Sequence, residues 1–327
     1  MNQVVVSVLG GQGGQARGIQ VESGVVQVKF LSINTQTILL VILLKDGFKM
    51  YTPEGTRMVS FRSISGARDN QGDQQGDSAS VFCRGICTGG KNSRDFFIGD
   101  SAGRIHCYRY EAEAKSGSDP VSDVAVHEDH REAQGGAIVE IGGCEKFVCS
   151  GDDSGNIVCY SAVGGDEVLR KACFFRNPGL TLSSIAVRNY TCISTYTNGQ
   201  IQVHNLKTQT LYAIIAGHSR AITAMDVYPL SDEDGKNIFC TVGEDSIMSV
   251  WTYPNFEEKD SNSDAVNLLC SDIVIDQLLT GVQFINCDNN NNIAASSYDG
   301  ETIEIWKHNE NAEFCGRGRT ASGESKS

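Results

Sequence analysis

A motif that recurs six times constrains the fold of this 327-residue chain more than any other feature. Each copy has an apolar strand, a tight polar turn, a second strand with alternating side chains, and a closing aromatic residue or histidine. The closing residues, about 51 positions apart on average, are Tyr51, Tyr108, Tyr160, His204, Trp251 and Trp306. Self-similarity at a fixed period predicts an array of similar structural units.

The turns identify the six copies as β-hairpins. Five turns carry a glycine late in the turn, as in Asn198-Gly199, whereas the fifth copy has Gly243-Glu244-Asp245. Asn-Gly and Asp-Gly supply the positive φ angles that tight hairpins require. The flanking segments, such as Ile38–Leu44, are rich in apolar and β-branched side chains, which favours strands.

A second pattern precedes each hairpin and predicts the innermost strand of a four-stranded blade. A small or polar residue is followed there by apolar alternation, as in Arg84-Gly85-Ile86, Gly136-Ala137-Ile138, Ser183-Ser184-Ile185, Arg220-Ala221-Ile222 and Thr280-Gly281-Val282, with Val25-Val26 in the first copy. Polar inserts at 69–78, 111–119, 231–236 and 257–264 predict exposed loops. A β-sandwich also contains regular hairpins, but six hairpins of one chemistry at near-constant pitch favour an all-β propeller.

The composition limits the classes of partner. The chain carries 27 basic and 40 acidic residues, a net charge of −13, which is opposite in sign to most nucleic-acid-binding surfaces. Its 12 cysteines have irregular spacing without a C-x-x-C motif, and the N-terminus lacks a signal peptide pattern. The longest apolar run has seven residues, too few to span a bilayer. We therefore expect a cytoplasmic protein that binds other proteins or peptides, with neither a nucleic-acid site nor a transmembrane segment.

At these residues the chain resembles the WD-repeat family. The fifth copy carries the fullest signature, namely His218 after Gly217, then Thr241, Asp245 and Trp251. The resemblance implies that these four side chains form a buried hydrogen-bonded tetrad with a structural role. Other copies keep part of the signature: Asp299 lies one place off relative to Trp306, and Tyr160 and His204 stand where tryptophan is expected.

The number of blades is open at this stage. The family implies seven blades, and the sequence contains six signatures. We expect a single propeller over residues 1–307 with seven-bladed ancestry and a reduced first blade, followed by a disordered tail at 308–327. The strand predicted at residues 4–9 is a candidate to complete the last blade, because an N-terminal strand often closes a propeller and removes its sheet edges.

Three segments could carry other chemistry, and each favours a plain structural interpretation. His127-Glu128-Asp129-His130 has two imidazoles three positions apart, but we expect a surface loop without a metal. Residues 10–14 are glycine-rich but are not followed by G-K-S/T or a helix, so no phosphate site is expected. Residues 287–292 lack the glycine and glutamate of a calcium loop. The sequence therefore predicts no catalytic, metal or cofactor site.

The expected function is a non-catalytic interaction scaffold in cytoplasmic signalling or complex assembly. Arg84 and Arg220 each precede the innermost strand of a blade, and arginine is enriched at interface hot spots, so both are candidate protein-binding residues of the top face. A structural subunit of a ciliary or cytoskeletal assembly is the alternative. A propeller enzyme with a central-channel active site is less favoured, because the starts of the innermost strands are mostly Gly, Ser, Ala, Thr and Arg. The oligomeric state and the identity of the partners are open.

Overall fold

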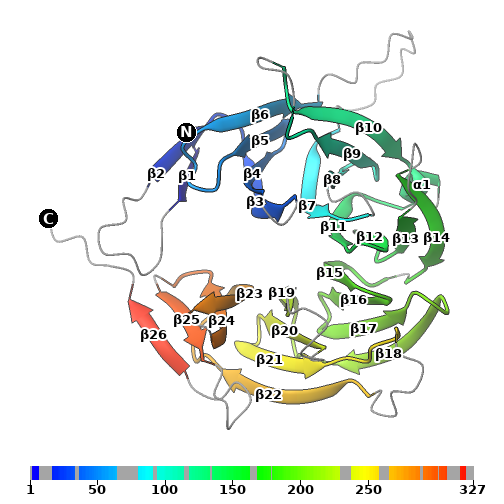
Figure 1. The fold of residues 1–327 in the computed structure, drawn as a ribbon. Coiled ribbons are helices and arrows are strands. Elements are labelled where there is room, and N and C mark those ends of the chain that lie inside the picture. The colour runs from blue at the N-terminus through cyan, green and yellow to red at the C-terminus, as the bar shows by residue number, and fades with distance from the viewer. Residues whose placement is uncertain are drawn as a thin grey trace, which may run out of the picture. The chain divides into compact units, whose positions relative to one another are not determined.

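The computed structural model consists of two compact units, Met1–Phe174 and Phe175–Ser327. Figure 1 labels their strands. The described residues are 2–6, 17–33, 37–64, 80–90, 94–113, 118–132, 135–162, 168–177, 179–228, 237–257, 265–287, 290–300, 302–307 and 317–321. The predicted loops at 69–78 and 231–236 and the glycine-rich residues 10–14 lie outside them, as do 114–117, 258–264 and 288–289 from the other predicted loops. Strands dominate both units.

The first unit begins with a two-stranded sheet, β1 (Asn2–Val6) and β2 (Arg17–Val21). Three four-stranded sheets follow, which we call blades 1 to 3. Blade 1 has β3 (Val25–Ser32), β4 (Ile38–Leu44), β5 (Gly47–Tyr51) and β6 (Met58–Ser63). Blade 2 has β7 (Phe82–Thr88), β8 (Asp95–Asp100), β9 (Ile105–Tyr110) and β10 (Val121–His127). After the short helix α1 (Asp129–Glu132), blade 3 has β11 (Ile138–Gly143), β12 (Phe147–Asp152), β13 (Ile157–Ala162) and β14 (Leu169–Phe175).

The second unit contains blades 4 to 6, again with four strands in chain order. Blade 4 has β15 (Leu182–Arg188), β16 (Thr191–Tyr196), β17 (Gln200–Asn205) and β18 (Thr210–Ala216). Blade 5 has β19 (Ile222–Val227), β20 (Ile238–Gly243), β21 (Ile247–Thr252) and β22 (Asn267–Ile273). Blade 6 has β23 (Leu279–Cys287), β24 (Asn290–Ser297), β25 (Thr302–Trp306) and β26 (Arg317–Ala321).

All six predicted hairpins form the second and third strands of a blade. The predicted all-β class and the blade arrangement are therefore confirmed. In every blade the pairing of the first and second strands shifts register after its first residue pair, which marks a β-bulge at the same place. In blade 5, for example, Ile222 pairs with Gly243 but Ala224 pairs with Val242, so one extra residue lies on the first strand. A bulge bends its strand and changes where nearby side chains point.

The apolar side chains of each blade pack against the neighbouring sheets of its unit. Leu39, Val41 and Leu43 of β4 lie in one core cluster with residues of blade 2. The alternate residues Leu40, Ile42 and Leu44 lie in another cluster with the β1–β2 sheet. The continuous apolar run of β4 thus reflects burial on both faces, which stabilises the fold by about 1.5–3 kcal/mol per large side chain.

Two expectations about the chain ends differ from the structure. The N-terminal strand does not complete the last blade, because β1 pairs with β2 and the fourth strand of blade 6 is β26. The short β1–β2 sheet precedes blade 1, at the place where a reduced blade is expected. Strand β26 also lies within the segment 308–327, for which the sequence predicts a disordered tail.

Candidate functional site

A chain of hydrogen bonds joins the four residues of the predicted tetrad in blade 5. His218 lies before β19, and its Nδ1 is 2.9 Å from Asp245 Oδ1 in the turn between β20 and β21. Its Nε2 is 2.8 Å from Thr241 Oγ1 on β20. The indole Nε1 of Trp251 on β21 donates to the same Oγ1 at 3.0 Å. All four side chains thus belong to one network, and Thr241 and His218 are buried.

The network fixes the orientation of the imidazole. Asp245 can only accept when ionised, so Nδ1 of His218 donates to it, and Nε2 is hydrogen-bonded to the hydroxyl of Thr241. The Thr241 oxygen also accepts from Trp251, so both ring nitrogens of His218 and the indole N–H have partners. Burial favours a raised pKa for Asp245, but hydrogen bonds from His218 and from the Ser219 backbone N–H outweigh it and lower the pKa. The set works as a structural clamp rather than as a nucleophile and base.

The clamp also holds the loop that carries Arg220. The backbone N–H of Ser219 donates to Asp245 Oδ2 at 2.9 Å, and the N–H of His218 donates to the Gly199 carbonyl at 3.0 Å. A Cβ at Gly199 would lie 2.1 Å from the His218 carbonyl oxygen, so this turn and the loop are in close contact. Arg220 follows directly and is exposed. The loop therefore presents the guanidinium from a fixed backbone.

A second network of the same kind lies in blade 3, where the sequence predicts a surface loop. His130 of α1 is fully buried, with Nδ1 3.0 Å from Asp152 Oδ2 and Nε2 2.8 Å from Ser150 Oγ. The expectation of an exposed loop is therefore wrong for His130, whose imidazole is held inside the blade. Ser150 precedes Tyr160 by the ten residues that separate Thr241 from Trp251, and this spacing is the signal that could have located the network.

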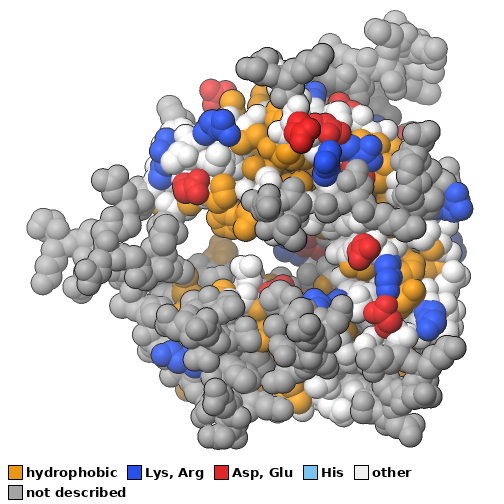
Figure 2. All heavy atoms as spheres, in the orientation of Figure 1, with side chains coloured by type: hydrophobic (Ala, Val, Ile, Leu, Met, Phe, Trp, Pro, Cys, Tyr) orange, Lys and Arg blue, Asp and Glu red, His pale blue; other side chains and the backbone are white. Residues whose placement is uncertain are grey.

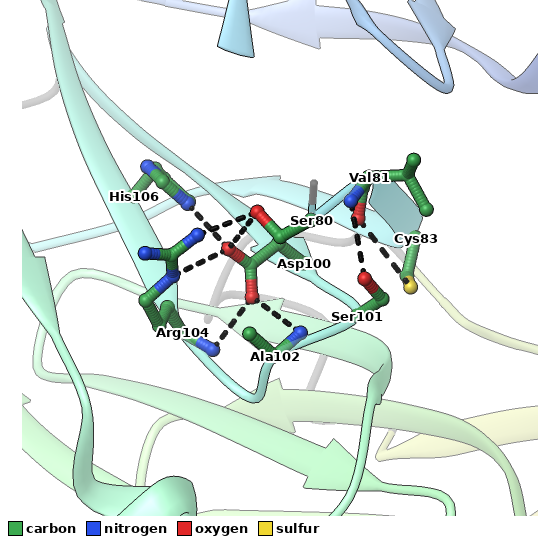
Figure 3. A network of polar contacts seen from close by, with 8 residues as sticks. All are labelled: Ser80, Val81, Cys83, Asp100, Ser101, Ala102, Arg104 and His106. Carbon is green, nitrogen blue, oxygen red and sulfur yellow. Dashed lines mark hydrogen bonds and ion pairs between the residues drawn. The ribbon is translucent and has the colours of Figure 1, made fainter. Parts of the chain in front are cut away.

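A third network surrounds Asp100 at the end of β8 in blade 2 (Figure 3). Its carboxylate lies 2.9 Å from His106 Nε2 and 2.7 Å from Arg104 Nε. The backbone N–H groups of Ala102 and Arg104 donate to Oδ1, both at 2.9 Å, and Arg104 also donates to Ser80. Burial favours a raised pKa for Asp100, but the hydrogen bonds from His106 and Arg104 outweigh it and lower the pKa. Sequence analysis missed this network because its histidine lies on β9, after the turn.

The other signature residues have different partners. Trp306 Nε1 donates to Asp272 Oδ2 on β22 at 2.8 Å, so it joins blade 6 to blade 5, and the exposed Asp299 is not its partner. The register explains this difference, because Ala295 occupies the place on β24 that Thr241 has on β20. His204 stands where tryptophan is expected in blade 4, and the centroid of its ring lies 4.3 Å from the centroid of the Phe175 ring.

Arg84 lies inside an enlarged bulge. Phe82 pairs with Asp100 and Ile86 with Ile98, so β7 holds two extra residues here, one more than the other blades have. The Arg84 side chain is 42% exposed, and its Nε lies 3.1 Å from Glu140 Oε2 on β11. Arg84 therefore joins blades 2 and 3 and also reaches solvent.

The backbone around Arg84 is tightly packed. Gly85 has a φ of 121°, and a Cβ there would lie 2.9 Å from Glu140 Cα, so only glycine fits. Its N–H donates to Gln27 Oε1 at 3.0 Å. Burial raises the pKa of Glu140, although the nearby cations Arg84 and Lys29 oppose the shift. Arg84 belongs to the first unit and Arg220 to the second.

The described residues show neither of two other kinds of site. They contain no group of three or more His, Cys, Asp or Glu side chains placed to hold a metal ion. They also contain no helix with the length and apolarity needed to cross a membrane.

Solved structures share the fold at low sequence identity. The β-propeller domain of Cps50 (Swd1) from Myceliophteria thermophila is 11% identical, with a TM-score of 0.62 over 97% of this chain and 88% of that domain. A chain of a mitotic checkpoint complex is also 11% identical, with a TM-score of 0.62 over 90% of this chain and 75% of its own. These similarities show a β-propeller fold.

The sequence comparisons give the family. WD repeat-containing protein 54 of Homo sapiens is 28% identical over 80% of this chain and 72% of its own length. The protein of the same name from Mus musculus is 25% identical over the same shares. The family model WDR54 matches residues 12–308, which include the tetrad and all six hairpins. The chain therefore belongs to the WDR54 family of WD-repeat proteins.

Proposed function

We propose that this chain is a non-catalytic protein-interaction scaffold that serves cytoplasmic signalling or complex assembly. Family membership supports the general role, because WD-repeat propellers commonly act as scaffolds. The observation that carries the proposal is the fixed presentation of Arg220. The His218–Asp245 clamp holds the backbone on its N-terminal side, while the arginine side chain itself is exposed.

A fixed exposed arginine suits partner binding for a physical reason. Ordering a loop and its side chains opposes association, so a loop that is already held binds with less loss of entropy. The guanidinium offers five donors in a planar fork that matches carboxylates and backbone carbonyls. Arg84 supports the proposal in the same way in the first unit, since its ion pair with Glu140 orients a half-exposed side chain.

The test is quantitative affinity purification of the tagged full chain from cells. Arg220→Ala and Arg84→Ala are compared separately with the parent chain, and Arg57→Ala, an exposed arginine in the turn between β5 and β6, is the matched control. We expect at least one partner to be lost with Arg220→Ala and retained with Arg57→Ala. The proposal fails if the parent chain captures no protein above the tag alone, or if both variants keep every partner. Recovery of tubulin or other cytoskeletal proteins would favour the structural-subunit alternative.

A further inference from the structure

A patch of exposed apolar side chains lies where β22 leads into β23. Large apolar side chains are rarely this exposed in one contiguous group without a function. The members of this group, which we call the β22–β23 patch, are Ile273 (58% exposed), Ile275 (73%), Leu278 (42%) and Tyr298 (75%).

Backbone hydrogen bonds hold together the segments that carry these side chains. The Val274 N–H donates to the Ser246 carbonyl at 2.8 Å, which joins the β22–β23 connection to the turn of blade 5. The Tyr298 N–H donates to the Leu278 carbonyl at 2.8 Å, which joins the same connection to the turn of blade 6. Val274 itself is fully buried and anchors the connection. The four residues therefore lie on neighbouring segments of two blades whose backbone is held in place.

Carboxylates border the patch. Glu244, Asp276 and Asp299 are all exposed, and the latter two are direct neighbours of Ile275 and Tyr298. The Glu244 N–H donates to the Ala221 carbonyl at 2.9 Å, so Arg220 also lies at this border. Three acids and one base leave the border acidic, in a chain whose net charge is −13. Charge complementarity therefore favours a basic ligand.

Two polar atoms beside the patch add to this preference. Gln277 Oε1 and Ser297 Oγ are buried and have no hydrogen-bond partner among the described residues. A Cβ at Gly300 would lie within 4 Å of both atoms, so the two share one location next to Tyr298. Each can accept a hydrogen bond, and a lysine or arginine brought to this place would supply the donor after a side-chain rotation.

We propose that the β22–β23 patch binds a basic segment of a partner protein that carries large apolar side chains between lysines and arginines. The apolar side chains cover Ile275, Leu278 and Tyr298, and the flanking cations face Asp276, Asp299 and Glu244. The inference rests on the proposed scaffold function and gives it a location and a ligand chemistry.

The test uses the full chain and fluorescent synthetic peptides with a Leu-Phe core between arginines and lysines, measured by fluorescence anisotropy. Two comparison peptides replace the basic residues with glutamates or the Leu-Phe core with Gly-Ser. We expect binding of the basic apolar peptide only, with affinity that weakens as salt concentration rises. Equal binding of the glutamate peptide would contradict the proposal.

Two variants locate the binding surface. Ile275→Ser/Tyr298→Ala should lower the affinity about tenfold or more. Glu244→Gln/Asp276→Asn/Asp299→Asn should lower it about threefold and flatten the salt dependence, and asparagine tolerates the positive φ of position 276. The matched control is Ile214→Ser, which changes an isoleucine that is 59% exposed on β18 of the same unit. Thermal unfolding checks that all three variants are folded. Unchanged affinity in the Ile275→Ser/Tyr298→Ala protein would overturn the proposal.

Two further outcomes separate this inference from the scaffold function. If the Ile275→Ser/Tyr298→Ala chain keeps every partner in affinity purification, the patch assignment fails while the scaffold function stands. If sedimentation shows that the parent chain self-associates and that the same variant does not, a second copy occupies the patch and the assignment to a partner peptide is wrong.

Discussion

The histidine of the blade 5 clamp joins two other members of the tetrad through its two ring nitrogens. His218→Ala would leave the carboxylate of Asp245 and the hydroxyl of Thr241 without their shared partner. A buried group that loses a charged hydrogen bond costs about 1.5–3 kcal/mol, so we expect a loss of about 3 kcal/mol in the free energy of unfolding. Urea unfolding measures it. Thr210→Ala, at an exposed position on β18, is the control and should change it by less than about 0.5 kcal/mol.

A double-mutant cycle with Thr241→Val would test whether the clamp acts as a unit. Valine keeps the shape of threonine but removes the oxygen that both His218 and Trp251 contact. The two changes should therefore cost less together than the sum of their separate effects. Strict additivity would show that the hydrogen bonds are energetically independent.

In the turn of the fifth copy, Ser246 stands where the other turns have a late glycine. Its φ is +65°, and it lies five residues before Trp251, the place that Gly103, Gly155 and Gly199 occupy relative to their own closing residues. Those glycines have φ values between 77° and 85°. The serine thus adopts a left-handed backbone conformation at a place where the turns of blades 2, 3 and 4 have glycine.

Ser246→Gly should therefore stabilise the protein. Relief of the left-handed strain is worth about 1 kcal/mol, part of which the greater freedom of glycine in the unfolded chain offsets. We expect a higher midpoint in thermal unfolding. The reverse change at the equivalent place in blade 2, Gly103→Ser, should lower the midpoint. A destabilised Ser246→Gly protein would mean that the serine side chain contributes more than its backbone costs.

The enlarged bulge of β7 leaves no room for a side chain at Gly85. Gly85→Ala would place a methyl group 2.9 Å from Glu140 Cα and from Ile141 N, in a backbone conformation with φ +121°. The collision and the strain together predict a loss of about 3 kcal/mol in stability. Gly90→Ala is the matched control, because its φ is +84° but its new Cβ would meet only the Ala162 Cβ at 3.9 Å. It should cost about 1 kcal/mol, and equal losses would contradict the packing argument.

The sequence predicted the second and third strands of every blade far better than the fourth. Hairpin strands such as Ile38–Leu44 are buried on both faces and joined by turns with strict chemistry, so their pattern is strong. Outer strands pair on one side only, and β26, with the sequence RGRTA, has almost no apolar pattern and was assigned to a disordered tail. The His130 network was missed because His130 lies on the short helix α1 in a polar segment that reads as a loop, whereas its partners Ser150 and Asp152 lie on β12.

One face of blade 1 is only partly covered by its neighbouring sheet. Residues opposite one another in the register share a face, so Val28 and Phe30 lie on the same face of blade 1 as Ile42 and Leu40. The β1–β2 sheet covers the middle of this face but leaves Val28 43% and Phe30 55% exposed. Figure 2 shows apolar side chains that reach the surface over blade 1. The sequence predicted a reduced blade at the place of the β1–β2 sheet. How much of the blade 1 face this sheet covers depends on tertiary packing, which local sequence does not encode.

For the chain as a whole, the buried carboxylates predict how stability changes with pH. The pKa values of Asp100, Asp152 and Asp245 are all lower in the folded state than the ordinary value of 3.8. A lowered folded-state pKa gives stability that is present above the unfolded-state pKa and is lost as pH falls through the folded-state value. Glu140 has a raised pKa and contributes with the opposite sign.

We therefore expect the urea midpoint to fall steeply below about pH 4 as the three carboxylates become protonated. Asp152→Asn removes one of them, so the variant should be less stable than the parent chain at pH 7 and the difference should shrink toward pH 3. Circular dichroism at each pH measures both midpoints. A difference that stays constant over this range would show that the Asp152 charge is not the source of the stability.

The bulge that every blade places after its first residue pair has a use in sequence comparison. The Trp–Asp signature is complete only in blade 5, whereas the bulge is present in all six blades, including blade 1, where Ile42 and Tyr51 stand at the places of Thr241 and Trp251. Alignment of repeats on the bulged residue, instead of on tryptophan, would recover blades whose signature has eroded. Propellers whose sequences no longer contain a recognisable Trp–Asp signature should become detectable in this way.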